Sequence, residues 1–127
     1  MLSMYDQPLT HEILLQIKEA LNRVNRRFLA ITTADDFLVN DDGVDRLDSI
    51  CMMLIAMGEN LKHIDKITNG TMLSQYPEID WKGAKGIRDI ISHHYFDINA
   101  EIIFSVCDER LNALEEAIDK MLTKTKN

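Results

Sequence analysis

The sequence predicts an all-α fold, an up-and-down bundle of four main helices, and three observations support it. Apolar residues recur at alternating steps of three and four in three long segments, which gathers them into one stripe on a helix. No segment alternates apolar and polar residues for long enough to suggest a half-buried strand. With 127 residues, 46% of them hydrophobic, and only two prolines, the chain suits one domain with its own core, spanning 1–127.

The first predicted helix runs from about Thr10 to Ile31, and the Thr10 hydroxyl could cap it. Its apolar stripe consists of Leu14, Ile17, Leu21, Val24, Phe28 and Ile31. A polar break follows at residues 32–43, and we expect it to contain a short extra helix near residues 35–40.

The same spacing predicts the second and fourth helices. Their stripes are Leu47, Ile50, Leu54, Met57, Leu61 and Ile64, and then Phe104, Cys107, Leu111, Leu114, Ile118 and Met121. Between them, Asn69 and Gly70 mark a turn, and Trp81 opens a shorter third helix. Either Asp97 or Asn99 can cap the last helix.

Composition limits the class of function and the compartment. A net charge of −7 argues against a protein that coats nucleic acid through a general positive field, so any RNA contact must be local. Both cysteines fall in apolar helical patterns, which indicates buried free thiols and fits a reducing cytoplasm. The longest apolar run, 50–58, is shorter than the roughly 20 residues of a membrane span. No export or membrane insertion is expected.

Residues 88–95, which we call the octad, read Arg-Asp-Ile-Ile-Ser-His-His-Tyr, with the spacing Arg-x4-His-x-Tyr. At about 100° per residue, Arg88 and Tyr95 lie on nearly the same helix face, whereas Arg88 and His93 lie about 140° apart. Either the helix loosens near His93 or a second copy of the chain completes the site. The small residues Gly83, Ala84 and Gly86 favour the second alternative, a homodimer, because they would let another backbone come close.

These residue types suit RNA cleavage, in which the substrate supplies its own nucleophile, the 2′-hydroxyl. Imidazoles such as His93 exchange protons near neutral pH, and Arg88 can bind phosphate oxygens with two parallel donors. Asp89, one turn before His93, could hold the tautomer of that imidazole. Lys82 and Lys85 offer a local basic patch that would guide the RNA backbone.

Simpler interpretations exist for each of these residues. A lone histidine on a helix is more often an ordinary polar residue than a catalyst, and Arg88 and Tyr95 could simply stack or pair on the surface. Lys82, Lys85 and Arg88 could be a solvated face matched to the acidic loop 41–48. Adjacent His93 and His94 make a poor metal pair, because successive side chains diverge around a helix. No metal site is therefore expected.

Further motifs extend the pattern beyond the octad. These motifs are the segment 57–62, which reads Met-Gly-Glu-Asn-Leu-Lys, and the Pro-x-x-x-Trp and Gly-x-Arg patterns within residues 77–88. Together with the octad, they resemble the HepT-like branch of the HEPN ribonuclease toxins. The resemblance covers most of the chain from about Asp42 onward. The resemblance implies a metal-independent RNA endonuclease without cofactor, dimeric, with Arg88 and His93 as the catalytic pair at the interface cleft. We interpret Glu59 as structural or interfacial.

The resemblance also implies a partner. It implies that the chain is the toxin of a type VII-like toxin-antitoxin module. The antitoxin would be an MntA-like nucleotidyltransferase that neutralises the toxin by adding AMP to Tyr95. The added charge and bulk would occupy the place of substrate phosphate beside Arg88. Whether neutralisation proceeds by modification or by complex formation stays open. The sequence departs from the family at Asp89, often Asn, and at His94, often acidic, so either His93 or His94 could be the general base.

Two other classes of function compete with the nuclease. The first is a non-catalytic helical accessory subunit that binds a nucleotidyltransferase and presents a substrate to it, with Arg88 and Tyr95 serving recognition. The second is a purely structural dimerisation bundle, in which substitutions at Arg88, His93 and Tyr95 would change neither cleavage nor modification.

Overall fold

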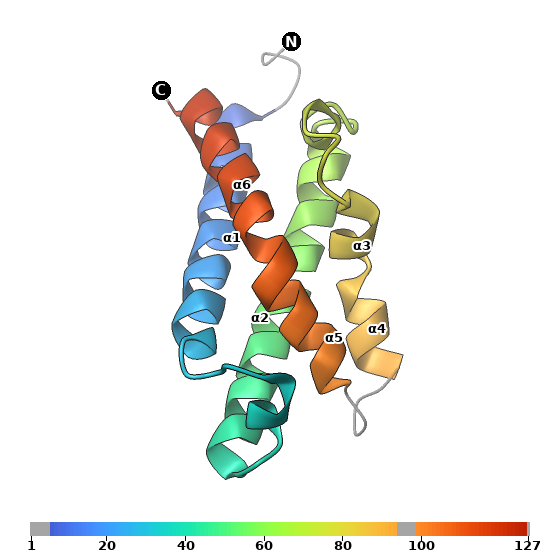
Figure 1. Cartoon of the computed structure of the whole chain (residues 1–127). Helices are drawn as coiled ribbons and strands as arrows, with labels where there is room; N and C mark the ends of the chain where they lie inside the picture. Colours follow the sequence, from blue (N-terminus) through green and yellow to red (C-terminus); the bar gives the residue numbers. More distant parts are fainter. Residues whose placement is uncertain (1–5, 94–98, 127) are drawn as a thin grey trace.

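The chain forms a bundle of antiparallel helices in a computed structural model that describes residues 6–93 and 99–126 (Figure 1). Those residues include no strand, and the predicted all-α bundle is confirmed. The helices are α1 (Gln7–Phe28), α2 (Asp41–Ile67), α3 (Trp81–Lys85), α4 (Ile87–His93), α5 (Ala100–Ser105) and α6 (Leu111–Thr125), with short 3-10 helices at Ala34–Phe37 and Leu73–Gln75.

Helix α1 begins earlier than the sequence predicts. Asp6 is its cap, because its Oδ1 accepts a hydrogen bond from the backbone N–H of Leu9 at 3.0 Å. Thr10 is therefore not the cap; it is buried within the first turn, where its hydroxyl donates to the Asp6 carbonyl at 2.7 Å. The helix ends at Phe28, and Ile31 reaches the core from the segment that follows.

The connection between α1 and α2 contains the predicted short extra helix, Ala34–Phe37, with Phe37 fully buried. The Asp36 Oδ2 accepts the backbone N–H groups of Thr32 at 2.7 Å and Thr33 at 3.0 Å, and these bonds lower the pKa of Asp36. Asn40 then caps α2 by accepting from the Gly43 N–H at 2.8 Å.

The third and last predicted helices are each interrupted. The third divides at Gly86, which closes α3 by donating its N–H to the Lys82 carbonyl at 3.0 Å before α4 begins. The last helix is predicted as one element, but a π-helical turn at Val106–Arg110 separates α5 from α6. Asn99 caps α5 as predicted, whereas Asp97 lies outside the described residues.

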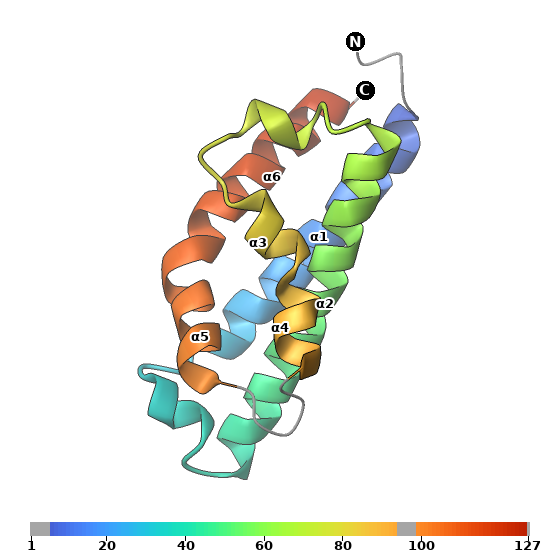
Figure 2. The same cartoon turned by 90° about the vertical axis from the view of Figure 1, so that its right-hand side faces the viewer.

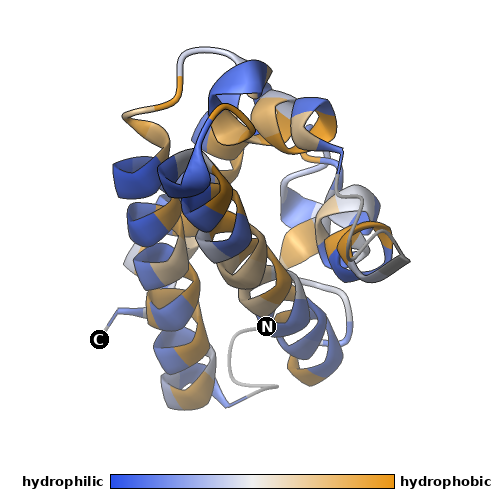
Figure 3. Ribbon diagram, turned by 90° about the horizontal axis from the view of Figure 1, so that it is seen from below, coloured by the Kyte–Doolittle hydropathy of each residue, from blue (hydrophilic) through white to orange (hydrophobic). Residues whose placement is uncertain are grey.

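Helix α2 is central: α1 packs along it on one side and α3 and α4 on another (Figure 2). Seen along the bundle, hydrophobic residues face inward between the helices and hydrophilic residues face outward (Figure 3). Lys18 ties α1 to α6 through Glu115 at 2.7 Å and Asp119 at 2.9 Å. Among the described residues, no helix has the length and apolar character needed to cross a bilayer.

The two cysteines are buried and free, as predicted. Cys51 lies in α2 and Cys107 in the π-helical turn, and burial raises the pKa of each thiol to about 12. Thiols with so high a pKa are poor nucleophiles at neutral pH, so neither belongs to the candidate site.

Candidate functional site

Arg88 lies on the exposed side of α4, which the buried side chains of Ile87 and Ile91 anchor to the core. Its Nη1 lies 3.5 Å from the Oε1 of Glu59 on α2. The side chains are 56% and 42% exposed, so this ion pair is weak and the guanidinium remains accessible. Glu59, which the sequence suggested only as structural or interfacial, is therefore a carboxylate in contact with Arg88.

Gly58 allows α3 and α4 to approach α2 closely. A Cβ at this position would lie 2.9 Å from the Ala84 carbonyl oxygen and 3.2 Å from Cγ2 of Ile87. The backbone that comes close to Ala84 is thus α2 of the same chain, and a Cβ at Gly83 would meet its own cap residue Asp80. These small residues are explained within one protomer, so they no longer argue for a second copy.

Lys82 and Lys85 lie beside two further lysines from α2, Lys62 and Lys66, around an open depression of about 570 Å³. Lys85 Nζ lies 2.7 Å from Oδ2 of Asp65, which ties α3 to α2. Lys62 and Lys66 are not among the residues that the sequence pattern predicts for the site. Their spacing of four residues on one helix face was the available signal, but only tertiary packing brings that face beside α3.

The histidines and the tyrosine of the octad are only partly placed. His93 is the last residue of α4, and its side chain, His94 and Tyr95 lie outside the described residues. The convergence of Arg88 and His93, and the supporting role of Asp89, therefore stay predictions. Among the described residues, no three side chains of metal-ligating type gather at one place.

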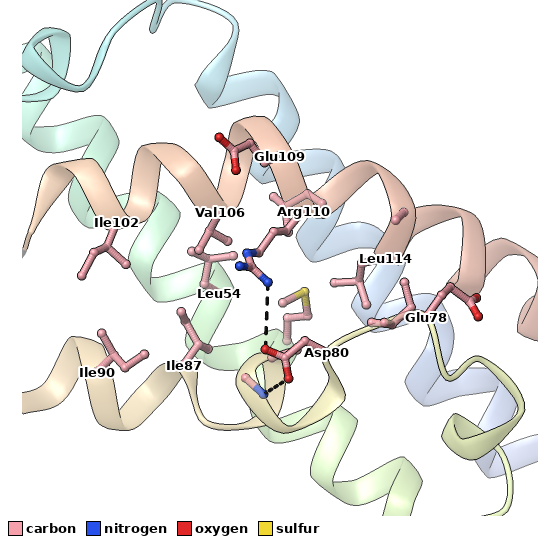
Figure 4. A pocket seen from close by; sticks show the side chains of 16 residues that line it. Leu54, Glu78, Asp80, Ile87, Ile90, Ile102, Val106, Glu109, Arg110 and Leu114 are labelled. Carbon is pink, nitrogen blue, oxygen red and sulfur yellow. Dashed lines mark hydrogen bonds and ion pairs between the residues drawn. The ribbon is translucent and has the colours of Figure 1, made fainter.

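On its other flank, α4 borders an apolar groove of about 520 Å³ (Figure 4). Leu54 of α2 lies at its base, and Ile90 of α4 faces Ile102 of α5 across it. Ile90 and Ile102 are 44% and 42% exposed, which is high for aliphatic side chains on facing helices. Arg110 reaches across the groove toward Asp80, with Nη1 of Arg110 3.9 Å from Oδ2 of Asp80 (Figure 4).

Comparison with known proteins gives a consistent assignment. A family model described as "HepT-like: Ribonuclease HepT-like" matches residues 17–121. "Putative RNase MJ0127" of Methanocaldococcus jannaschii is 30% identical over 96 residues, covering 76% of this chain and 69% of that protein. "Putative RNase TTE0752" of Caldanaerobacter subterraneus subsp. tengcongensis is 29% identical over 70 residues, covering 55% and 59%. No solved structure matches the chain. The family match covers most of the helical bundle, including α4 and Arg88, and the chain therefore belongs to the HepT-like ribonuclease family.

Proposed function

We propose that the chain is a metal-independent RNA endonuclease and the toxin of a type VII-like toxin-antitoxin module. The observation that carries this proposal is the exposed guanidinium of Arg88 beside a group of lysines, on a protein with a net charge of −7. A local positive site on an acidic protein suits a ligand with closely spaced negative charges, such as an RNA backbone.

The proposed reaction is an internal transfer that requires no added nucleophile. One histidine, His93 or His94, accepts the proton of the 2′-hydroxyl as the 2′-oxygen attacks the adjacent phosphorus. The bond from phosphorus to the 5′-oxygen breaks, and that oxygen leaves with a proton from an acid, giving a 2′,3′-cyclic phosphate and a 5′-hydroxyl. Arg88 stabilises the charge that develops on the phosphorane oxygens. Asp89, four residues before His93, would hold the imidazole in the required tautomer.

The active form in this proposal is a homodimer. On one helix Arg88 and His93 are separated by about 140°, so a second protomer could bring the missing group to the first. The apolar groove beside α4, with Ile90 and Ile102 partly exposed at its mouth, supports such a contact.

Neutralisation in this proposal involves an MntA-like nucleotidyltransferase that adds AMP to Tyr95. The added phosphodiester would compete with substrate phosphate for Arg88. A Tyr95→Phe variant should cleave RNA like the parent but stay active after incubation with the antitoxin and ATP. If the antitoxin silences this variant as well, neutralisation works by complex formation and the proposed modification is not required.

The test of the nuclease is cleavage of RNA by the purified chain without partner and with EDTA present. Arg88→Ala and His93→Ala should each lower cleavage by at least 100-fold, roughly the effect of losing a transition-state donor or a general base. Arg23→Ala is the matched control, because Arg23 is a comparably exposed arginine of α1 paired with Glu19. Equal cleavage by all four proteins would reject this catalytic pair.

A non-catalytic accessory subunit of a nucleotidyltransferase is the second candidate, and the acidic net charge of −7 suits it equally well. The same experiment separates the two candidates. A folded parent chain that cleaves no RNA, but whose Tyr95 is still modified by the partner, is such a subunit. A chain that is neither a nuclease nor modified is a structural dimerisation bundle.

A further inference from the structure

Helices α2 and α3 together present a basic surface that the acidic composition conceals. It surrounds the open depression of about 570 Å³, and four ammonium groups there face two carboxylates. We call it the lysine surface; it comprises Lys62, Lys66, Lys82 and Lys85, with Asp65 and Asp89 among them. On a chain of net charge −7, this surface therefore holds a local excess of positive charge.

The lysine surface is continuous with Arg88. Glu59 offers one carboxylate oxygen to each of two cations: Oε1 lies 3.5 Å from Nη1 of Arg88, and Oε2 lies 3.1 Å from Nζ of Lys62. An anion bound at Lys62 is therefore close to the arginine proposed to contact the scissile phosphate.

The cations of α2 and those of α3 and α4 form two rows that run side by side. Helix α2 and the pair α3 and α4 are antiparallel (Figure 2), so Asp65 pairs with Lys85 while Glu59, further back along α2, pairs with Arg88. From Lys66 to Glu59 the helix rises by about 10 Å. At about 3.4 Å per nucleotide of a stacked strand, the surface spans roughly three phosphates.

The cations of this surface differ in their availability. Lys85 is held by Asp65, and Lys62 shares Glu59 with Arg88. Lys66 and Lys82 are exposed, and within residues 6–93 and 99–126 neither forms an ion pair. Lysine acts as a compact point charge on a flexible stem, which suits contact with phosphates without reading the bases.

We propose that single-stranded RNA lies along the lysine surface, with its phosphates contacting Lys62 and Lys66 of α2 as well as Lys82 and Lys85 of α3, and that this track leads the scissile linkage to Arg88. The inference rests on the proposed ribonuclease function, and it assigns Lys62 and Lys66 as substrate-binding residues. Contacts of this kind position the strand and add affinity without sequence preference.

Binding is measured by fluorescence anisotropy with a labelled single-stranded 2′-O-methyl RNA, which lacks the nucleophile and cannot be cut, between 50 and 300 mM NaCl. The slope of log K against log salt is negative, and each lost phosphate contact should lower its magnitude by roughly 0.7, so Lys62→Ala/Lys66→Ala should lower it by roughly 1.4. Lys66→Ala alone, which leaves Glu59 and Lys62 in contact, should lower it by roughly 0.7. The control is Lys120→Ala/Lys126→Ala, which removes the same charge outside the depression.

In cleavage assays, Lys66→Ala should raise KM and leave kcat unchanged, because the lost contact is equal in the ground and transition states. The proposed RNA track is overturned if the salt slope of Lys62→Ala/Lys66→Ala equals that of the control. It is also overturned if the parent binds no 2′-O-methyl RNA. If the parent binds with the predicted slopes yet cleaves no RNA, the nuclease fails while the surface stands.

Discussion

In the proposed function Arg88 has two requirements that conflict, since its guanidinium must be positioned and yet free to bind phosphate. The contact with Glu59 satisfies both, because two groups 3.5 Å apart and about half exposed attract each other by less than about 1 kcal/mol. A phosphate approaching along the lysine surface can displace such a carboxylate. A shorter and more buried ion pair with Glu59 would hold Arg88 in place but would hinder its binding to phosphate.

Glu59→Gln tests this balance. Loss of the carboxylate removes a competitor for phosphate beside Arg88 and Lys62, so the affinity for 2′-O-methyl RNA at low salt should rise several-fold. The melting temperature should change by less than about 2 °C, since exposed pairs contribute little to stability. Glu19→Gln, which removes the partner of Arg23 on α1, is the control and should leave affinity unchanged. Weaker binding by Glu59→Gln would mean that Glu59 orients Arg88 more than it competes.

Asp36 gives a prediction for the dependence of stability on pH. Two backbone N–H groups lower its pKa in the folded chain, so its contribution to stability is present above the ordinary carboxyl pKa of 3.8 and is lost as the pH falls through the lower folded value. Asp36→Asn should therefore melt below the parent at pH 7, and the difference should shrink below pH 4.

The control for that titration is Asp35→Asn. Asp35 is the exposed neighbour, and its carboxylate accepts no hydrogen bond in the described part of the chain. The melting temperature of Asp35→Asn should equal that of the parent at each pH. If Asp36→Asn melts below the parent by the same amount from pH 7 to pH 3, the charge of Asp36 does not contribute to these hydrogen bonds.

At the scale of elements, apolar spacing located the long helices because burying a stripe is what stabilises them. It does not fix the capping residue, so the sequence predicts Thr10 where Asp6 caps α1. The break at Gly86 was also missed, since glycine is tolerated inside helices. A π-helical turn changes the hydrogen bonding by one residue and leaves the apolar spacing largely intact, so the sequence shows no sign of it.

The candidate site was predictable to the extent that it is local. Arg88, Lys82 and Lys85 follow from spacing along one segment, and in the structure Lys82 and Lys85 lie on α3 and Arg88 on α4. Glu59, Lys62 and Lys66 come from α2, and their proximity depends on how two helices pack. No periodicity within either segment encodes that distance.

Gly58→Ala tests this packing. An added Cβ meets backbone, the Ala84 carbonyl at 2.9 Å, so α3 must move away from α2. Overpacking of this kind costs about 1–3 kcal/mol, and the better helix propensity of alanine offsets about 1 kcal/mol. We expect a net loss of about 1 kcal/mol in the free energy of unfolding, measured by urea titration, and reduced RNA cleavage. Met52→Ala, at an exposed position of the same helix, is the control. A more stable Gly58→Ala protein would show that the close approach is not required.

At the scale of the whole molecule, α3 and α4 separate two surfaces of different character. The lysine surface lies on the flank toward the C-terminal half of α2, and the apolar groove lies on the flank toward α5 and α6 (Figure 4). A second protomer on the groove would therefore leave the lysine surface open to RNA. Dimerisation and substrate binding can use the same short helix without competing for it.

The proposed dimer leads to a prediction about mass and activity together. Ile90→Glu/Ile102→Glu places two carboxylates at the mouth of the groove, and burying them against a partner would cost several kcal/mol. Light scattering should show a change from dimer to monomer, with helical content kept and RNA cleavage lost, because one protomer alone lacks part of the site. The same variant should keep the salt slope for 2′-O-methyl RNA, since the lysine surface lies within one protomer.

Leu29→Glu, at a leucine that is 85% exposed beyond the end of α1, is the control and should remain dimeric and active. If the double variant stays dimeric, the dimer uses another surface, and if it is monomeric and cleaves RNA at the parent rate, one chain suffices for catalysis.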